Sequence, residues 1–417
     1  MNSLNCSNSI VRLPFATQSR TLFIAFDAVR TGTLFAVVVL SVLTSSPFNS
    51  YGTTVVGDSG SQGSSNRQVD VTQAETMLDF LRSSVCGQVD PHMIDAVLNA
   101  HGTGLIISQQ NISRTVTREQ YRALLSALSC EQWPDIAPVD ASERARRGVE
   151  GLRKDVWTAL RWGRPNTTLL AERVEEVKRL DVLRKAVSLA THFLPETVQL
   201  SPHLYVVMGG RAGAAALEGD EIYFDVLTTS YRAAGGALRY PTPSQIVEYF
   251  AHETHHIGLS QIINRTRHHL RLKTSDQRAF DFLVALVMEG SASYLINGHR
   301  SLEAMRRDPQ FTENLKKGDE LLKRAEQVLK SVLEKNLDGE AYEQATAPFL
   351  GSGWHCAGAI MLAAIDQASG LKGVMEVSRD PRKLLVAYRR ASAKLRLRAT
   401  QNSFDKTLAK RISSMGS

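Results

Sequence analysis

The sequence contains few cysteines, and no two of them have the spacing of a metal-binding pair. Its 417 residues include four, Cys6, Cys86, Cys130 and Cys356. Because none belongs to a Cys-x-x-Cys pair, a structural zinc site built on thiolates is not expected. Cys86 and Cys130 could form a disulfide in an oxidising compartment, but the sequence alone does not decide whether they pair. Cys356 is more typical of a small buried apolar residue than of a nucleophile.

Stretches in which basic and aromatic side chains alternate are also absent. Aromatic residues make up only 7% of the chain, although its formal net charge is +7. A nucleic-acid surface usually combines both kinds of side chain, so we expect no nucleic-acid partner. The basic residues gather in 144–147, 265–273 and 389–411, and we expect them on solvated helix faces.

The apolar run near the amino terminus is too short to span a bilayer alone. Residues 33–43 are mostly apolar and follow three arginines, which is the pattern of a signal-peptide core. An earlier apolar patch, 21–29, is interrupted by Asp27. We therefore expect residues 1–48 to be a signal peptide or a signal anchor, with 21–45 as the anchoring part. The protein would then be exported, periplasmic or extracellular, and would touch the membrane only through this segment.

The rest of the chain is predicted to be mainly helical, with one small sheet. Capping-box patterns at Thr72 and Thr117 predict helix starts in its first part. The runs 203–208 and 221–226 are rich in β-branched and aromatic residues and predict strands, and the helical pattern returns from Pro241. No internal repeat is evident, so we predict an α+β, mainly α, fold. The predicted parts are a flexible linker, 49–69, a helical amino-terminal region, 70–165, a core region with the small sheet, 166–300, a helical carboxy-terminal region, 301–395, and a basic tail, 396–417.

The segment 244–263 is predicted to be a helix that carries a metal-binding pattern. Thr242 can cap its start, and Pro243 suits the first helical turn. Within it stands the sequence His-Glu-Thr-His-His. Residues four apart lie on one face of a helix, so His252 and His256 can offer imidazole nitrogens to the same ion.

Glu253 follows the first of these histidines and is badly placed to bind the same ion. It can instead take the proton of a metal-bound water, and two neutral nitrogen ligands with such a carboxylate are what zinc hydrolysis needs. His255, three residues after His252, could also pair with it on a metal. The second ligand therefore remains open between His256 and His255.

A catalytic zinc needs a third protein ligand, for which Glu289 is the best candidate. It lies inside a second predicted helix that begins with a capping-box pattern at Thr274 and ends at Asn297-Gly298. The surroundings are apolar, and a buried carboxylate needs a partner, which zinc would supply. The alternative is an ion pair with an arginine such as Arg278 or Arg265. We expect one zinc ion per chain.

The two helices together resemble a known family. A His-Glu-x-x-His helix followed by a helix with the pattern Glu-Gly-x-Ala, here Glu289–Ala292, is similar to the gluzincin group of zinc metallopeptidases. More narrowly, the chain resembles bacterial zinc-dependent peptidases of unknown function, from about residue 70 to 392. The resemblance implies a zincin-like catalytic core with a small sheet and two metal-binding helices. It implies no particular substrate.

Further site residues are weaker candidates. Gly209, Gly210 and Gly213 could let a neighbouring strand align the substrate backbone, although an ordinary flexible hairpin loop would look the same. His355 is similar in placement to the Tyr or His that related proteins carry to stabilise the oxyanion of the tetrahedral intermediate. Tyr294 competes with it for that role, and either residue could simply be packing.

We therefore predict an exported zinc metallopeptidase that acts on a peptide or protein substrate. Zinc held by His252, His256 and Glu289 would polarise the scissile carbonyl, and Glu253 would be the general base. Two alternatives remain: a zinc hydrolase of a non-peptide amide, and a metal-binding module without activity. The cleavage specificity and the oligomeric state do not follow from the sequence.

Overall fold

The computed structural model describes residues 69–86, 88–111, 114–209, 213–217, 220–235, 239–337, 339–397 and 404–416. These residues all belong to one compact unit, Gly32–Ser417. The predicted signal segment 1–48, almost all of the linker 49–69, and Gly210 lie outside the described residues. The residue boundaries predicted for the regions of the chain remain predictions.

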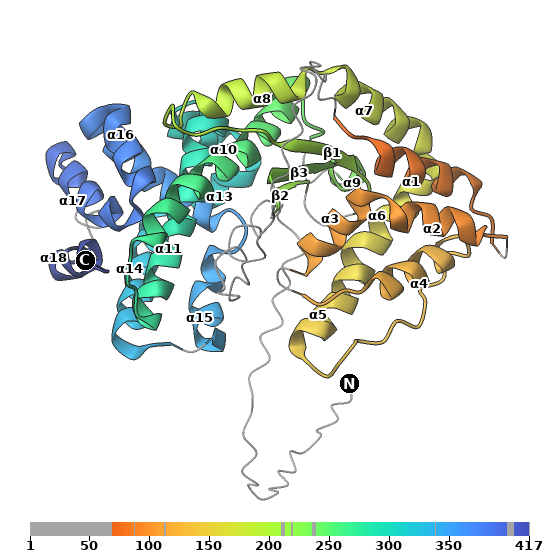
Figure 1. The fold of residues 1–417 in the computed structure, drawn as a ribbon, viewed down its shortest axis with the longest axis horizontal. Helices are drawn as coiled ribbons and strands as arrows, with labels where there is room; N and C mark the ends of the chain where they lie inside the picture. Colours follow the sequence, from red (N-terminus) through yellow and green to blue (C-terminus); the bar gives the residue numbers. More distant parts are fainter. Residues whose placement is uncertain are drawn as a thin grey trace, which may run out of the picture. The chain divides into compact units, whose positions relative to one another are not determined.

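The first part of the described chain is helical (Figure 1). Its helices are α1 (Thr72–Ser83), α2 (Pro91–Asn99), α3 (His101–Gln110), α4 (Arg118–Leu128), α5 (Glu143–Gly151), the π-helical η2 (Leu152–Trp157), α6 (Thr158–Gly163), the short η3 (Arg164–Asn166), α7 (Thr167–Arg179) and α8 (Val182–Thr191). The capping box predicted at Thr117 is confirmed, because its side chain and that of Gln120 each accept from the other's backbone N–H. The box predicted at Thr72 is wrong. Thr72 is already inside α1, and Asp70 accepts its backbone N–H instead.

A disulfide ties the end of α1 to the end of α4. It joins Cys86 and Cys130, which are 44 residues apart in sequence. The bond closes a loop that contains α2, α3 and α4, so it restrains the unfolded chain as well as the folded one. Cys356 is a buried free thiol, and burial raises its pKa to about 12.

The sheet has three strands in the order β1-β3-β2. They are β1 (His203–Val207), β2 (Ala214–Ala216) and β3 (Glu221–Asp225); β1 pairs with β3 in parallel, and β2 pairs with β3 antiparallel. Both predicted strands are confirmed. The third, β2, was missed, because three alanines give no strand pattern. It is the edge strand nearest the predicted site, which makes the omission important.

The second helical part supplies the predicted metal-binding helices. It runs through α9 (Val226–Ala234), α10 (Pro243–His268), α11 (Thr274–Ser291), the π-helical η5 (Ala292–Asn297), α12 (Leu302–Arg307), α13 (Pro309–Lys316), α14 (Gly318–Lys335), α15 (Gly339–Thr346), η6 (Ala347–Phe349), α16 (Gly353–Arg379), η7 (Pro381–Lys383), α17 (Leu384–Leu395) and α18 (Lys406–Ser413). Thr242 caps α10 and forms a capping box with Gln245. The box predicted at Thr274 is wrong, because Lys273 is the cap residue and no side chain caps α11.

Close packing of α11 on α16 positions the site. A Cβ added to Gly290 would lie 2.4 Å from the carbonyl carbon of Gly358, and one added to Gly358 would lie 2.0 Å from the carbonyl oxygen of Leu286. Only glycines allow the two backbones to approach this closely. Gly290, the residue after Glu289, therefore lets the start of α16 lie beside that carboxylate.

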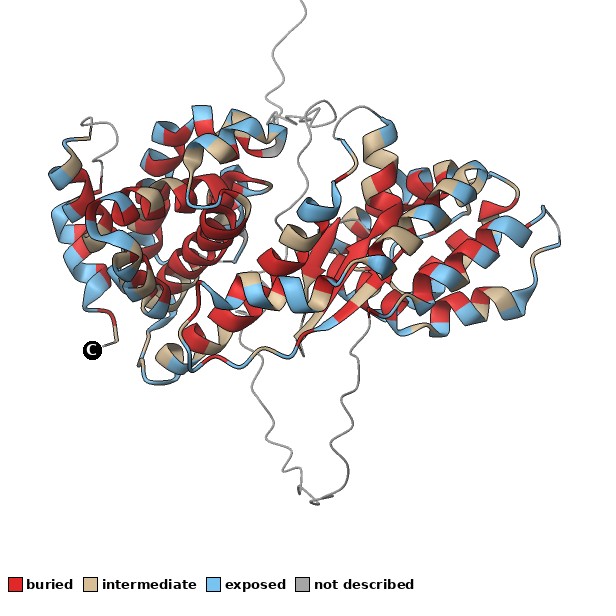
Figure 2. Cartoon of the chain, turned by 90° about the horizontal axis from the view of Figure 1, so that it is seen from above, coloured by how far each residue is buried: buried red, intermediate tan, exposed pale blue. Residues whose placement is uncertain are grey.

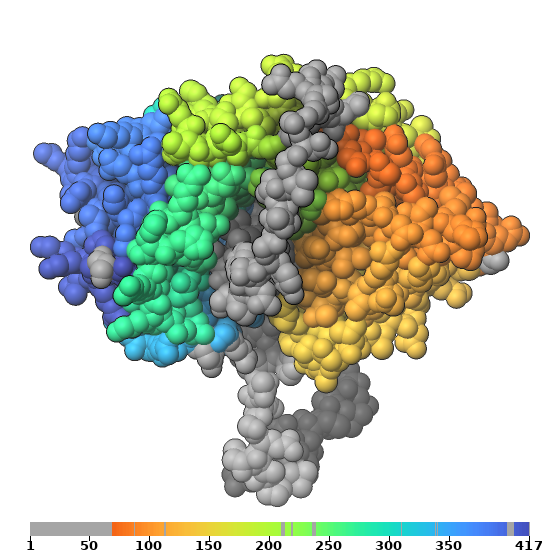
Figure 3. All heavy atoms as spheres, in the orientation of Figure 1, coloured from red at the N-terminus to blue at the C-terminus, as the bar shows by residue number. Residues whose placement is uncertain are grey.

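Buried residues line the strands and the faces on which helices pack (Figure 2). In the space-filling view, atoms of α8 form the upper edge of one face and atoms of α11 lie below them (Figure 3). The stretch Thr274–Asn297 is long and apolar enough to cross a membrane, but 94% of its apolar window is buried within the protein. A bent pair, Ala341–Phe349 with Gly353–Arg379, passes the same test of length and composition. For α11, packing in the core accounts for the apolar sequence.

Candidate metal centre

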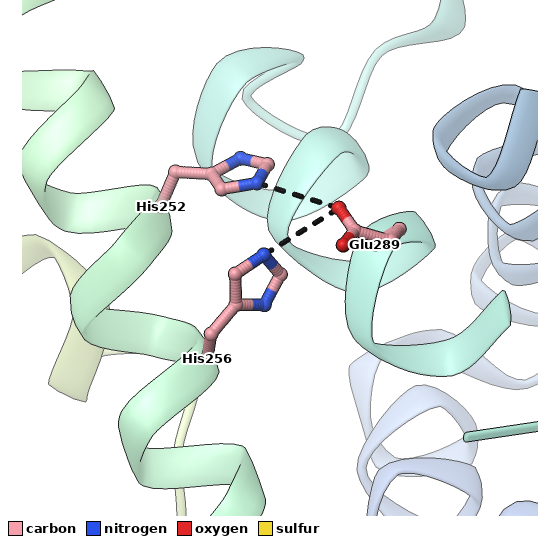
Figure 4. A group of neighbouring side chains, drawn as sticks. All are labelled: His252, His256 and Glu289. Atoms are coloured by element: carbon pink, nitrogen blue, oxygen red, sulfur yellow. Dashed lines mark ion pairs between the residues drawn. The ribbon is translucent and has the colours of Figure 1, made fainter. Parts of the chain in front are cut away.

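Two histidines of α10 face one residue of α11 (Figure 4). His252 and His256 are one helical turn apart, and their ring centroids are 4.6 Å from each other. The Nε2 atoms of His252 and His256 lie 3.8 Å and 3.5 Å from Oε2 of Glu289. All three side chains are buried. The helical period aligns the histidines, and the packing of α11 against α10 brings the carboxylate to them.

These three side chains form a group that can bind one metal ion. Their ligand atoms all lie within 4.8 Å of one another. In a tetrahedral zinc site with bonds of about 2.0–2.1 Å, ligand atoms are about 3.4 Å apart, close to the observed distances between Glu289 and the two rings. Two imidazoles and one carboxylate are also a common donor set for catalytic zinc, and they leave the fourth position free.

The charges in the group suit a cation. Burial by itself would raise the pKa of Glu289, but His355 and His256 outweigh it and hold that pKa well below its usual value. The carboxyl group is therefore ionised at neutral pH. Burial lowers the pKa of His256, but Glu289 raises it more, so the net shift is upward. Because a metal binds only the unprotonated nitrogen, this upward shift couples metal binding at His256 to pH.

Asn297 orients the first histidine. Its Oδ1 lies 2.7 Å from Nδ1 of His252. With Nδ1 donating to this amide oxygen, the lone pair of Nε2 points toward Glu289, which is the arrangement found around metal-binding histidines. The sequence indicated only a helix end at Asn297. The π-helical η5 carries the residue to this position, and π-helical turns often occur at functional sites.

His255 is not part of this group. Its side chain is completely buried, and neither ring nitrogen has a hydrogen-bond partner. Burial lowers its pKa to about 3, so the ring is neutral. Of the two second ligands that the sequence left open, the structure brings His256 to Glu289 and not His255.

Other acids that could replace Glu289 have partners of their own. Asp225 caps α9, accepting from the backbone N–H and the hydroxyl of Thr228. Asp281 is paired with Arg267 and accepts from Gln277.

Glu253 contacts the edge strand and lies outside the ligand group. Its Oε2 accepts the backbone N–H of Ala216 at 2.9 Å, and its side chain is buried. Asp225 N–H donates to the Gly213 carbonyl and Leu217 N–H to that of Glu221. Gly213 and Leu217 therefore occupy positions that are hydrogen-bonded to β3. In an antiparallel pair the residues between such positions direct their N–H and C=O groups away from the partner strand, so the N–H of Ala216 lies on the outer edge of β2. The carboxylate is thus held between α10 and that edge.

His355 and Tyr294 have contacts that the sequence could not foresee. His355 is 1% exposed, and its Nδ1 lies 3.0 Å from Oε2 of Glu289 and 2.8 Å from Oγ of Ser293. The hydroxyl of Tyr294 donates to Asp366, which also binds Arg300. His355 therefore adjoins the metal group through Glu289, whereas Tyr294 is tied to a separate buried ion pair. A role of His355 in oxyanion binding stays a prediction.

The candidate glycines differ in environment. Gly209 has φ +102°, its carbonyl accepts the Tyr121 hydroxyl at 2.7 Å, and an added Cβ would meet that oxygen at 2.4 Å. This glycine is required by the turn itself. Gly213 pairs with β3 through its carbonyl and lines a cavity together with Asn297. Gly210 is not among the described residues, so its role in substrate binding is untested.

Comparisons with known proteins give one match. A family model described as "Putative zinc dependent peptidase (DUF5700)" matches residues 146–396, more than half of the chain. The matched range contains α10, α11 and the start of α16, and so every residue of the metal group. Neither the curated proteins nor the solved structures include a match.

Proposed function

The chain belongs to the DUF5700 family of putative zinc dependent peptidases, and we propose that it hydrolyses peptide bonds at the metal group, with Glu253 as general base. The observation that carries the proposal is the position of Glu253. Its carboxylate is next to the metal group in sequence, outside it in space, and hydrogen-bonded to an edge strand. A carboxylate in this position can accept a proton from the reacting water without being a metal ligand itself.

His252 and His256 would hold zinc through Nε2, and Glu289 through a carboxylate oxygen. Bound zinc would polarise the scissile carbonyl and lower the pKa of the attacking water. Glu253 accepts the proton of that water as the oxygen bonds to the carbonyl carbon. When the C–N bond breaks, the same carboxyl returns the proton to the leaving amine nitrogen. Asn297 keeps the ring of His252 in one orientation throughout.

The edge strand β2 favours a peptide as the substrate. The backbone groups of Ala214 and Ala216 that do not bond to β3 lie on the free edge of β2. An extended peptide can add to such an edge through backbone hydrogen bonds to Ala214 and to the Ala216 carbonyl. Because the N–H of Ala216 already donates to Glu253, a peptide aligned there would lie beside the general base.

The direct test is to incubate the full-length chain, supplied with zinc, with an unbiased peptide mixture and to follow new amino termini by mass spectrometry. We expect cleavage that a chelator removes and added zinc restores. Intact peptides together with hydrolysis of a non-peptide amide, such as a cell-wall link, would favour the second kind of hydrolase. Stoichiometric zinc without hydrolysis of either would favour a binding module.

We also propose that the protein is exported. The Cys86–Cys130 disulfide supports this proposal, because disulfides persist in oxidising compartments and are rare in the cytosol. Expressed in a bacterial host, the full-length chain should be recovered outside the cytosol with both thiols protected from alkylation under denaturing conditions. Cys356 is the internal control, since it should react once the chain is unfolded.

A chain that begins at residue 67 is the matched control for export. It should stay in the cytosol, and Cys86 and Cys130 should then be alkylated. Recovery of the full-length chain only from the cytosol, with both thiols reduced, would disprove export.

A further inference from the structure

A cavity of about 680 Å³ adjoins the metal group. Asn297 lines it and also bonds His252, so one side chain joins the cavity to the site. Gly213, at the start of the edge strand, lines it as well. Glu248 and Tyr249 of α10 contribute from the turn that precedes His252. A peptide aligned on β2 would therefore have side chains or an end within reach of this cavity.

The cavity carries more basic than acidic groups. Three arginines line it: Arg232 of α9, Arg239 before α10, and Arg307 at the end of α12. Arg239 and Arg307 are exposed. Arg307 reaches an acidic partner, the exposed Glu303, only at 4.0 Å, and such exposed pairs contribute little. Among the described residues, Arg239 makes no hydrogen bond or ion pair.

Two carboxylates, Glu248 and Asp308, also line the cavity. Glu248 lies 3.3 Å from Nε2 of His299 and 3.3 Å from the hydroxyl of Ser244. Burial raises the pKa of Glu248, although His299 opposes that shift. Glu248 thus has a partner of its own in His299, and the three arginines still outnumber the two carboxylates, Glu248 and Asp308, that line the cavity.

Two further features suit an anion. The amino terminus of α10, a helix of 26 residues, lies at the cavity through Thr242 and Gln245, and its dipole is positive there. Tyr240 also lines the cavity, and its buried hydroxyl has no hydrogen-bond partner. Burial raises the pKa of Tyr240, so the hydroxyl keeps its proton as a donor. Arg173 stacks on the ring, 3.9 Å from its centroid, and holds it in place.

We infer that this cavity is a substrate subsite for a carboxylate, bound by Arg232, Arg239 and Arg307. The inference rests on the proposed peptidase function and names its preferred substrate class. The carboxylate has two possible sources, an aspartate or glutamate side chain near the scissile bond or the carboxy terminus of the substrate. Charge-assisted hydrogen bonds to arginine are the strongest that such a group can make in a protein.

The test compares peptides of one sequence that carry Glu, Gln or Lys at each position around the cleaved bond, each with a free and an amidated carboxy terminus. For the full-length, zinc-supplied chain we expect kcat/KM for Glu to exceed that for Gln by about 10- to 100-fold at one position. If kcat/KM instead falls when the carboxy terminus is amidated and does not depend on the side chain, the carboxy terminus is the bound group. Equal kcat/KM for all peptides would overturn the inference.

Matched variants assign the preference to the cavity. Arg307→Gln and Arg239→Gln should each reduce the preference for the Glu peptide over the Gln peptide at least severalfold. Arg306→Gln is the control and should keep both the preference and kcat/KM for the neutral peptide, because Arg306 is also exposed and pairs with Glu303 but is not among the residues that line the cavity. A preference unchanged in both cavity variants would also overturn the inference.

Binding separates this inference from the proposed function. Fluorescence anisotropy of labelled Glu and Gln peptides with the Glu253→Gln chain reads the subsite without turnover. Cleavage by the wild-type chain without a carboxylate preference would leave the peptidase standing and remove the subsite. Preferential binding of the acidic peptide without any cleavage by the wild-type chain would support the subsite and contradict the proposed peptidase function.

Discussion

Replacing Glu253 by Gln should leave zinc in place and lower kcat by about 10²- to 10⁴-fold, the usual contribution of a general base. Gln has the same size, and its amide oxygen can still accept the Ala216 N–H at the edge of β2. The amide cannot take a proton from water, so only the chemical step is affected. Zinc content measured by mass spectrometry and kcat for a cleaved peptide, determined on the same sample, provide the two readouts.

Glu326 provides the control for this substitution. It is also a buried glutamate, but it lies on α14, where it pairs with Lys330 and accepts the N–H of Asp405. Glu326→Gln should keep both zinc and kcat. Loss of zinc in Glu253→Gln would make Glu253 a ligand or a structural residue, and unchanged kcat would mean that the chemistry takes place elsewhere.

His256→Ala should abolish tight zinc binding and with it all measurable activity. Loss of a residue that merely orients a ligand commonly weakens metal binding by about 10- to 100-fold, so loss of a ligand itself should exceed about 100-fold. Glu289→Ala should behave in the same way and leave helicity nearly intact. Competition with a zinc chelator of known affinity measures the change.

His255→Ala is a closely matched control, because the two histidines are adjacent in α10 and both are buried. Of these two, His256 is the one that lies 3.5 Å from Glu289. His255→Ala should keep zinc affinity within severalfold of the wild type, although the chain should lose stability with the buried ring. If instead His255→Ala loses zinc and His256→Ala keeps it, the ligand pair is His252 and His255. If Glu289→Ala binds zinc normally, another acid completes the site.

Features that depend on neighbours in sequence could be predicted. The spacing of His252 and His256 places them on one face of any helix, whatever packs against it. Thr242 caps α10 as expected, and the strands around 205 and 223 follow from their residue types. Similar local patterns failed at Thr72 and Thr274, where the helices begin with other cap residues. A capping pattern states only that a cap can form, and the flanking backbone decides whether it does.

The immediate surroundings of the metal group were decided by the tertiary structure. Glu289 could be named from the sequence because a carboxylate in an apolar helix needs a partner, but its distance from the histidines depends on how α11 packs on α10. Likewise, the close contact of Gly290 with Gly358 brings His355 to Glu289. The contacts of Asn297 with His252 and of Ala216 with Glu253 join residues 45 and 37 positions apart. Helical periodicity sets directions within one element, whereas the distances between elements depend on the shapes of side chains far apart in sequence, and only the folded chain brings those side chains together.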